Sequence, residues 1–388
     1  GVISSDAKAG RVLDNTNAEI SNITVLSDEA VVNIFGISIG EKDIVDGENV
    51  SDIDLSISKI GSMIAGSGGI YLDSARTLDV GDVVTSGDLD VRITSGDLIF
   101  SSDQTVVSAS LEVKQGSLRQ VSGTTLETTG VSGSANSGDL DINVMRDVTF
   151  STMLVNSGNV TLVSELGSVL DGTLADTASL ENLVIHNGQL VEMSATQIGT
   201  HYEGGAINID ALDINSITAS EGGIFIGLTG RDEALTTIDT LTAIAEQSDV
   251  LITSGAGMLQ VNNANASDNL SLKAAGENGQ DSLLVGTARA GGNLALSSAV
   301  GNITQIENTD IIANSLGSVT ELSSGGDIIL VSATNDFDEL SVDSSKNLSA
   351  RDISNLKVFN INAVGNLSLT AAKQISLQDD TSITVGGD

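Results

Sequence analysis

The chain has 388 residues, of which 52 are acidic and 16 are basic, so its formal net charge is −36. Only 2% of its residues are aromatic, and it contains no Trp, no Pro and no Cys. This composition excludes disulfides, cysteine-based metal sites and thiol nucleophiles, and it argues against nucleic acid or an anionic membrane surface as a partner.

A degenerate repeat of Gly, then Asp or Asn, then an apolar–any–apolar triplet runs along the chain. Copies begin at Gly87, Gly96, Gly138, Gly158, Gly292, Gly326 and Gly365, and two copies without the Gly begin at Asp268 and Lys346. Gly readily adopts positive φ, and Asp or Asn can bond the nearby backbone, so each copy starts with a turn. The triplet has the period of a strand and sends alternate side chains to one side. The repeat therefore predicts many short strands around one aliphatic core.

The spacing of the copies predicts how the strands are connected. The interval from Gly138 to Gly158, like that from Gly326 to Lys346, is close to the repeat length of a solenoid coil. We therefore expect an all-β, right-handed parallel β-helix with roughly 20 residues per coil and roughly 19 coils. We expect a single elongated repeat domain over residues 1–388, with insertions near 101–138 and 175–204, where the repeat fades. The alternative is a row of β-sandwiches, which would normally carry a large aromatic residue in each core.

The inward positions of the strands should form stacked aliphatic columns. We expect burial at the first apolar position of each copy: Leu89, Leu98, Leu140, Val160, Leu294, Ile328, Leu348 and Leu367.

Two segments carry a family resemblance. Residues 291–305 read GGNLALSSAVGNITQ, and residues 365–377 read GNLSLTAAKQISL. They resemble the repeats of filamentous-haemagglutinin-type exoproteins, which are β-helical adhesins of Gram-negative bacteria. The resemblance implies a β-helical fold, export and an adhesive role. The secretion domain of that family carries Asn-Pro motifs, and a chain without Pro resembles the repeat shaft only.

Carboxylates are the main candidates for chemistry. Asp88 and Asp90, like Asp139 and Asp141, alternate with one intervening residue and share one face of a strand. Paired carboxylates on a β-helix could serve a polysaccharide lyase or glycosidase, which is the alternative function. Asp recurs at such positions along the whole chain, so we interpret these pairs as a solvated face and expect no enzyme and no catalytic residues.

Calcium is the candidate cofactor. No segment fits the spacing of an EF-hand loop. Crowded carboxylates can still bind the ion weakly, and the candidate ligands are Asp88, Asp90, Asp97, Asp139 and Asp141. His186 and His201 lie less than one expected coil apart and could form a two-histidine site, although surface histidines are far commoner.

These observations lead to one expected function. We expect an exported structural or adhesion protein, secreted or on a bacterial surface, whose acidic β-helix acts as a rod or binding surface. Its partners would be a host, cell-surface or matrix ligand, either protein or glycan, or further copies of itself. No apolar run is long enough to span a bilayer, so we expect no membrane insertion.

Overall fold

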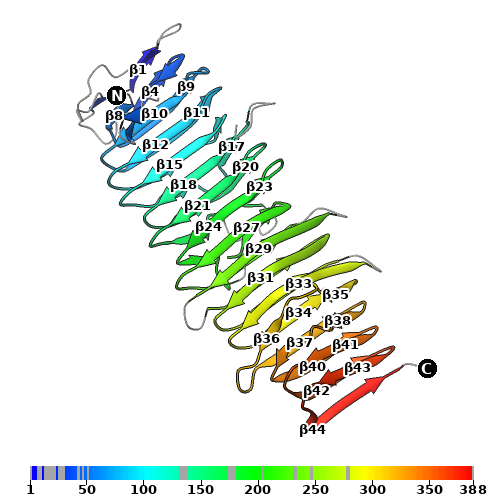
Figure 1. The fold of residues 1–388 in the computed structure, drawn as a ribbon. Helices are drawn as coiled ribbons and strands as arrows, with labels where there is room; N and C mark the ends of the chain where they lie inside the picture. The colour runs from blue at the N-terminus through cyan, green and yellow to red at the C-terminus, as the bar shows by residue number, and fades with distance from the viewer. Residues whose placement is uncertain are drawn as a thin grey trace. The chain divides into compact units, whose positions relative to one another are not determined.

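The structure is a computed structural model. It describes residues 2–6, 11–12, 23–24, 31–41, 44–45, 48–49, 52–130, 138–173, 181–202, 204–229, 234–244, 248–276 and 280–386. The chain forms two compact units: unit 1 contains residues 1–196 and 203–205, and unit 2 contains residues 197–202 and 206–388. Parallel strands stack coil upon coil in each unit as a right-handed β-solenoid, which confirms the predicted fold class (Figure 1). The described residues contain no helix, and therefore none that could span a membrane.

Each coil supplies strands to two parallel sheets, A and B. Sheet A of unit 1 contains β1 (Val2–Asp6), β4 (Val31–Phe35), β9 (Lys59–Ala65), β11 (Leu78–Thr85), β13 (Leu98–Phe100), β14 (Gln104–Val106), β16 (Leu118–Gln120), β17 (Thr125–Thr128), β19 (Val148–Phe150), β20 (Thr152–Val155), β22 (Ser168–Asp171) and β23 (Leu183–Ile185). Sheet B of unit 1 contains β2 (Arg11–Val12), β3 (Ile23–Thr24), β5 (Ser38–Ile39), β8 (Ile53–Ser56), β10 (Ile70–Ser74), β12 (Leu89–Ile93), β15 (Ala109–Val113), β18 (Leu140–Val144), β21 (Val160–Ser164) and β24 (Leu190–Ala195). A short antiparallel pair joins β6 (Ile44–Val45) to β7 (Glu48–Asn49).

Unit 2 follows the same plan. Its sheet A contains β25 (Gln197–Ile198), β26 (Ile207–Asp210), β28 (Ile224–Leu228), β30 (Val250–Ser254), β32 (Leu270–Ala274), β34 (Leu294–Ser298), β37 (Val319–Ser324), β40 (Glu339–Ser345), β42 (Asn355–Ala363) and β44 (Gln374–Val385). Its sheet B contains β27 (Asp213–Ala219), β29 (Leu235–Ala243), β31 (Met258–Ala266), β33 (Asp281–Ala290), β35 (Asn302–Gln305), β36 (Ile311–Ala313), β38 (Ile328–Leu330), β39 (Asp336–Phe337), β41 (Leu348–Asp352) and β43 (Leu367–Ala371).

The coils are longer and fewer than the sequence predicts. The described residues form about 14 turns of about 23 residues each. The register pair Leu140 and Val160 matches the expected short coil, but the steps from Ala109 to Leu140 and from Val160 to Leu190 are about half as long again. The spacing of the Gly residues reflects the length of the shorter coils only. The longer coils have additional residues between their strands, so the sequence underestimates the average coil length.

The core consists of columns of aliphatic side chains in consecutive coils. One column of unit 1 contains Leu89, Ala109, Leu140, Val160 and Leu190, which are paired in register and at most 3% exposed. Each layer therefore covers the apolar surface of the layer below it, and burial of this kind is the main stabilising contribution in a solenoid.

One of the eight predicted core residues is not buried. Seven of them are at most 1% exposed, but Leu367 in β43 is only half-buried. Within the described residues β43 pairs with β41 on one side and with no strand on the other. The prediction for Leu367 is therefore wrong, because a strand pattern shows which face a side chain takes but not whether another coil covers it.

The two regions where insertions are expected contain regular strands. In the first, β14 pairs in register with β17, and Gln104 faces Leu126. In the second, β23 pairs with β20. Residues 131–137, 174–180 and 203 lie outside the described residues, so the expected insertions stay a prediction.

Candidate functional site

The Asp or Asn of the repeat lies at a corner of the coil and joins that coil to the next. In unit 1, the Asp139 Oδ1 atom accepts a hydrogen bond from the backbone N–H of Asn159 at 2.7 Å. Gly138, just before it, has a φ of +100°, and a Cβ atom there would lie 1.7 Å from the carbonyl oxygen of Ser157. Gly is thus required because it permits both the left-handed turn and the close approach of the next coil.

In unit 2 the same contacts run through consecutive coils in two series, one at a corner before sheet A and one at a corner before sheet B. The Asp327 Oδ1 atom accepts from both the backbone N–H and the side-chain amide of Asn347, at 3.1 and 2.8 Å. The Asn347 Oδ1 atom in turn accepts from the backbone N–H of Asn366 at 2.8 Å. Equivalent bonds join Asp97 to Ser117, Asp147 to Ser168, Asp249 to Asn269, Asn269 to Asn293, Asn293 to Val319 and Asn302 to Asp327. We call this set of contacts the corner ladder.

Three of the five calcium candidates already hold polar partners from the next coil. Asp97 and Asp139 belong to the corner ladder. The Asp88 Oδ1 atom accepts from the Ser108 hydroxyl at 2.7 Å. These carboxylates therefore have a structural role in binding the next coil, which the sequence did not predict.

The other two candidates, Asp90 and Asp141, lie on the outer face of sheet B. They belong to one column but are separated by Ser110 of the intervening coil. Burial raises the pKa of Asp141, and the charge of Asp139 adds to this, while a hydrogen bond from Thr161 lowers it. No group of three or more metal-binding side chains occurs among the described residues. Weak Ca²⁺ binding by these acids stays a prediction.

A second group of charges lies on sheet B of unit 1 and was not found from the sequence. Asp54, Asp73, Arg92 and Glu112 are register neighbours on four successive strands, and we call them the acidic column. The Arg92 Nε atom lies 3.8 Å from Asp73 Oδ2 and 3.4 Å from Glu112 Oε2. Each of these residues follows the previous one by one short coil, and this regular spacing of charges is the signal that could have revealed them.

Burial changes the acidity of the acidic column and of its neighbour Asp52, which directly precedes β8. The pKa of Asp52 is raised from 3.8 to about 6 by burial first and then by the charges of Asp73 and Asp54. Burial also raises the pKa of Asp73 to about 6; Arg92 lowers it, and Asp54 raises it further. Carboxyl groups with such values are partly protonated near neutral pH and can donate a proton.

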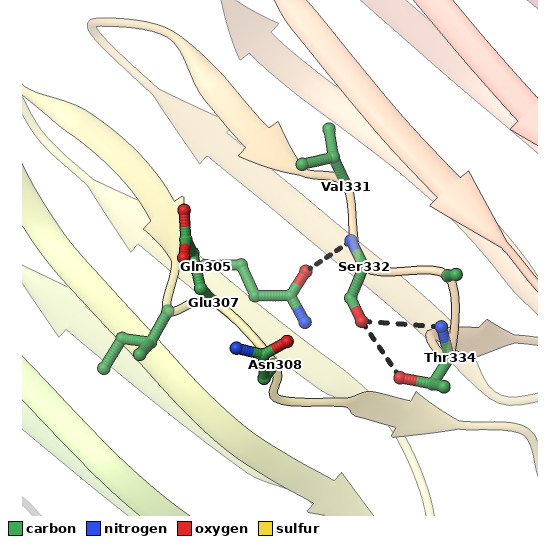
Figure 2. A pocket seen from close by; sticks show the side chains of 8 residues that line it. Gln305, Glu307, Asn308, Val331, Ser332 and Thr334 are labelled. Carbon is green, nitrogen blue, oxygen red and sulfur yellow. Dashed lines mark hydrogen bonds between the residues drawn. The ribbon is translucent and has the colours of Figure 1, made fainter.

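A surface hollow lies at a corner of unit 2, between two consecutive coils (Figure 2). It has a volume of about 510 Å³ and is lined by Gln305, Ile306, Glu307, Asn308, Val331, Ser332, Ala333 and Thr334. Figure 2 shows the side chain of Gln305 reaching from one wall toward Ser332 on the other. Its amide makes four hydrogen bonds: it donates to the Thr309 carbonyl and to Asn335 Oδ1, and it accepts from Ser332 N–H and from the Asn335 amide. Gln305 is thus fully used in holding the two walls together.

A related corner in unit 1 shows how the hollow arises. There Gln120 donates to the carbonyl of Thr124 and accepts from the N–H of Ser151, as Gln305 does with Thr309 and Ser332. The coil that follows the Gln120 corner has only Ser151 between β19 and β20. The coil that follows the Gln305 corner has five residues, 331–335, between β38 and β39. This longer arch stands away from the corner and forms the second wall of the hollow.

The two histidines have separate surroundings. His186 Nδ1 lies 3.1 Å from Asn156 Oδ1 in unit 1. The His201 ring packs edge-on against Phe225 in unit 2, with 5.5 Å between ring centroids. Neither contact indicates a metal or a catalytic role.

The comparisons with known proteins give no family. No protein-family model matches the chain, and neither a curated protein nor a solved structure matches it. The β-solenoid fold is compatible with the resemblance to filamentous-haemagglutinin-type repeats.

Proposed function

We propose that this chain is a structural or adhesive part of an exported bacterial surface or matrix protein, and that it acts through its outer faces. The corner ladder carries this proposal. Asp and Asn side chains, which in an enzyme would be available for chemistry, are used here at one coil after another to bind the next coil. A sequence that places its polar groups in this way favours a stable scaffold whose surface is its functional part.

The charge of the chain supports a class of partner. With a net charge of −36, the surface repels phosphate-rich partners such as nucleic acid and anionic lipid. Proteins or glycans of a host, a cell surface or a matrix fit this surface better. The resemblance of the repeats to filamentous-haemagglutinin-type shafts supports export and adhesion in particular.

Labelling of intact cells tests this proposal. An antibody against the chain should bind intact cells of the organism that makes it, and brief protease treatment of those cells should remove the label. A cytoplasmic enzyme that survives the same treatment is the control. Labelling that appears only after the cells are broken would contradict the proposal.

A polysaccharide-active enzyme is the second candidate, and the acidic column together with its neighbour Asp52 favours it. Asp52 and Asp73 have a pKa of about 6, near that of a general acid, and Arg92 beside them could hold an acidic sugar. Incubation with acidic polysaccharides, followed by measurement of new reducing ends, tests this candidate. Asp73→Asn should abolish any cleavage that depends on the column, and cleavage that persists in this variant would point to another site or a contaminant.

A further inference from the structure

We propose that the hollow at residues 305–308 and 331–334 binds an amino sugar of a glycan through the carboxylate of Glu307. The proposal deepens the proposed function, since it gives the surface protein a ligand. It rests on the shape of the hollow, on the groups that remain available in it and on their charge.

The shape comes from structure that is already in place. The Gln305 amide and the buried Asn335 tie the two walls together by paired hydrogen bonds of 2.7 and 2.9 Å. The Asn335 Oδ1 atom also accepts from the N–H of Ile311 at 2.9 Å, which fixes the corner to the strand behind it. A hollow of about 510 Å³ with fixed walls lies in the size range of small-ligand sites and needs little ordering when a ligand binds.

The polar residues that line the hollow and are available to a ligand are Glu307, Asn308, Ser332 and Thr334. Glu307 and Asn308 are exposed, and their side chains bond to no other described residue. Asn308 has a φ of +62°. At the related corner in unit 1 the equivalent residue is Gly123, which has a φ of +82°. An Asn in place of Gly keeps the turn, because Asn tolerates this conformation, and adds an amide that can both donate and accept. The Ser332 and Thr334 hydroxyls, 2.9 Å apart, add donors and acceptors on the opposite wall.

The lining of the hollow selects among ligand classes. The only charged side chain among its lining residues is the carboxylate of Glu307, so phosphate, sulfate and uronic acids are repelled. The apolar surfaces of Val331, which is 50% exposed, and Ala333 suit the C–H face of a sugar ring. The amide and hydroxyls suit its hydroxyl groups, and the carboxylate suits an ammonium group. A hexosamine with a free amine combines all three features, whereas a lysine side chain would use only the carboxylate.

Calorimetry with a glucosamine tetramer tests the site. The protein should bind one tetramer at low salt and at a mildly acidic pH where the amine is charged, and the N-acetylated tetramer should bind about tenfold more weakly. Glu307→Gln should weaken binding of the glucosamine tetramer by about tenfold, and Asn308→Gly by about fivefold. Both residues are exposed, so both variants should fold normally, which thermal melting checks.

Glu321→Gln is the matched control, because it removes the same charge from an exposed position of unit 2 outside the hollow. It should leave binding unchanged. Equal losses in Glu307→Gln and Glu321→Gln would show attraction to the acidic surface alone and overturn the proposal. So would the absence of binding, equal affinity for the acetylated tetramer, or tighter Glu307-dependent binding of a tetralysine peptide. Each of these outcomes would leave the labelling of intact cells, and with it the proposed function, unaffected.

Discussion

Removal of the Asn347 side chain should destabilise the solenoid although the residue is only half-buried. Its amide donates to Asp327 Oδ1 at 2.8 Å, and its Oδ1 atom accepts from the N–H of Asn366 at 2.8 Å. An intramolecular hydrogen bond contributes about 1 kcal/mol net, and one to a charged group somewhat more. Asn347→Ala deletes one bond of each kind, so we expect the free energy of unfolding to fall by about 2 kcal/mol.

Urea unfolding at neutral pH measures this loss of free energy. Two further variants serve as comparisons. Asn347→Asp keeps the acceptor for Asn366 but places a second carboxylate beside Asp327, so its destabilisation should shrink on acidification. Asn143→Ala changes an exposed Asn on the outer face of β18 and should alter the free energy of unfolding by less than about 0.5 kcal/mol. An Asn347→Ala protein as stable as Asn143→Ala would refute a stabilising role for the ladder.

Three further predictions concern the core, the acidic column and calcium. Leu140→Ala should lower the free energy of unfolding by about 3–5 kcal/mol, because its column neighbour Ala109 is too small to fill the cavity. Leu316→Ala, at a 95% exposed site, should change the free energy of unfolding by less than about 0.5 kcal/mol. Equal losses in the two variants would contradict a stabilising role for the aliphatic column. Asp52 and Asp73 have folded pKa values of about 6, raised from 3.8, so the stability they contribute is present below pH 3.8 and is lost as pH rises through 6. The thermal midpoint should therefore be higher at about pH 5 than at about pH 7, and Asp73→Asn should reduce this difference; an unchanged difference counts against the assignment. Ca²⁺ should raise the midpoint more than NaCl of equal ionic strength, by bridging outward carboxylates, and superimposed melting curves would exclude this binding.

The repeat was sufficient to predict the fold and most of its core. A Gly-Asp/Asn turn followed by an apolar–any–apolar triplet determines both where a strand begins and which face it buries, so residues such as Leu89 and Ile328 were placed correctly. Leu367 has the same local pattern but is half-buried, because burial depends on a neighbouring coil that local sequence does not describe.

The candidate sites could not be predicted in the same way. The acidic column appears in the sequence only as a regular spacing of charges, and its contacts depend on the register between strands of successive coils. The hollow depends on the arch of residues 331–335 meeting a corner of the previous coil. The corner ladder is an intermediate case. The sequence showed its Asp and Asn residues and suggested local turns or calcium, but their actual partners are backbone N–H groups of the next coil.

Amide hydrogen exchange at the corners tests the central claim most directly. The backbone N–H groups of Asn159, Asn347 and Asn366 lie at turns, where exchange is normally fast, but each donates to an Asp or Asn side chain of the previous coil. If the repeated polar residues are structural, these amides are protected in the presence of EDTA, and Asp139→Ala removes the protection at Asn159. Exchange at the rate of an open loop, or protection that requires Ca²⁺, would contradict the account.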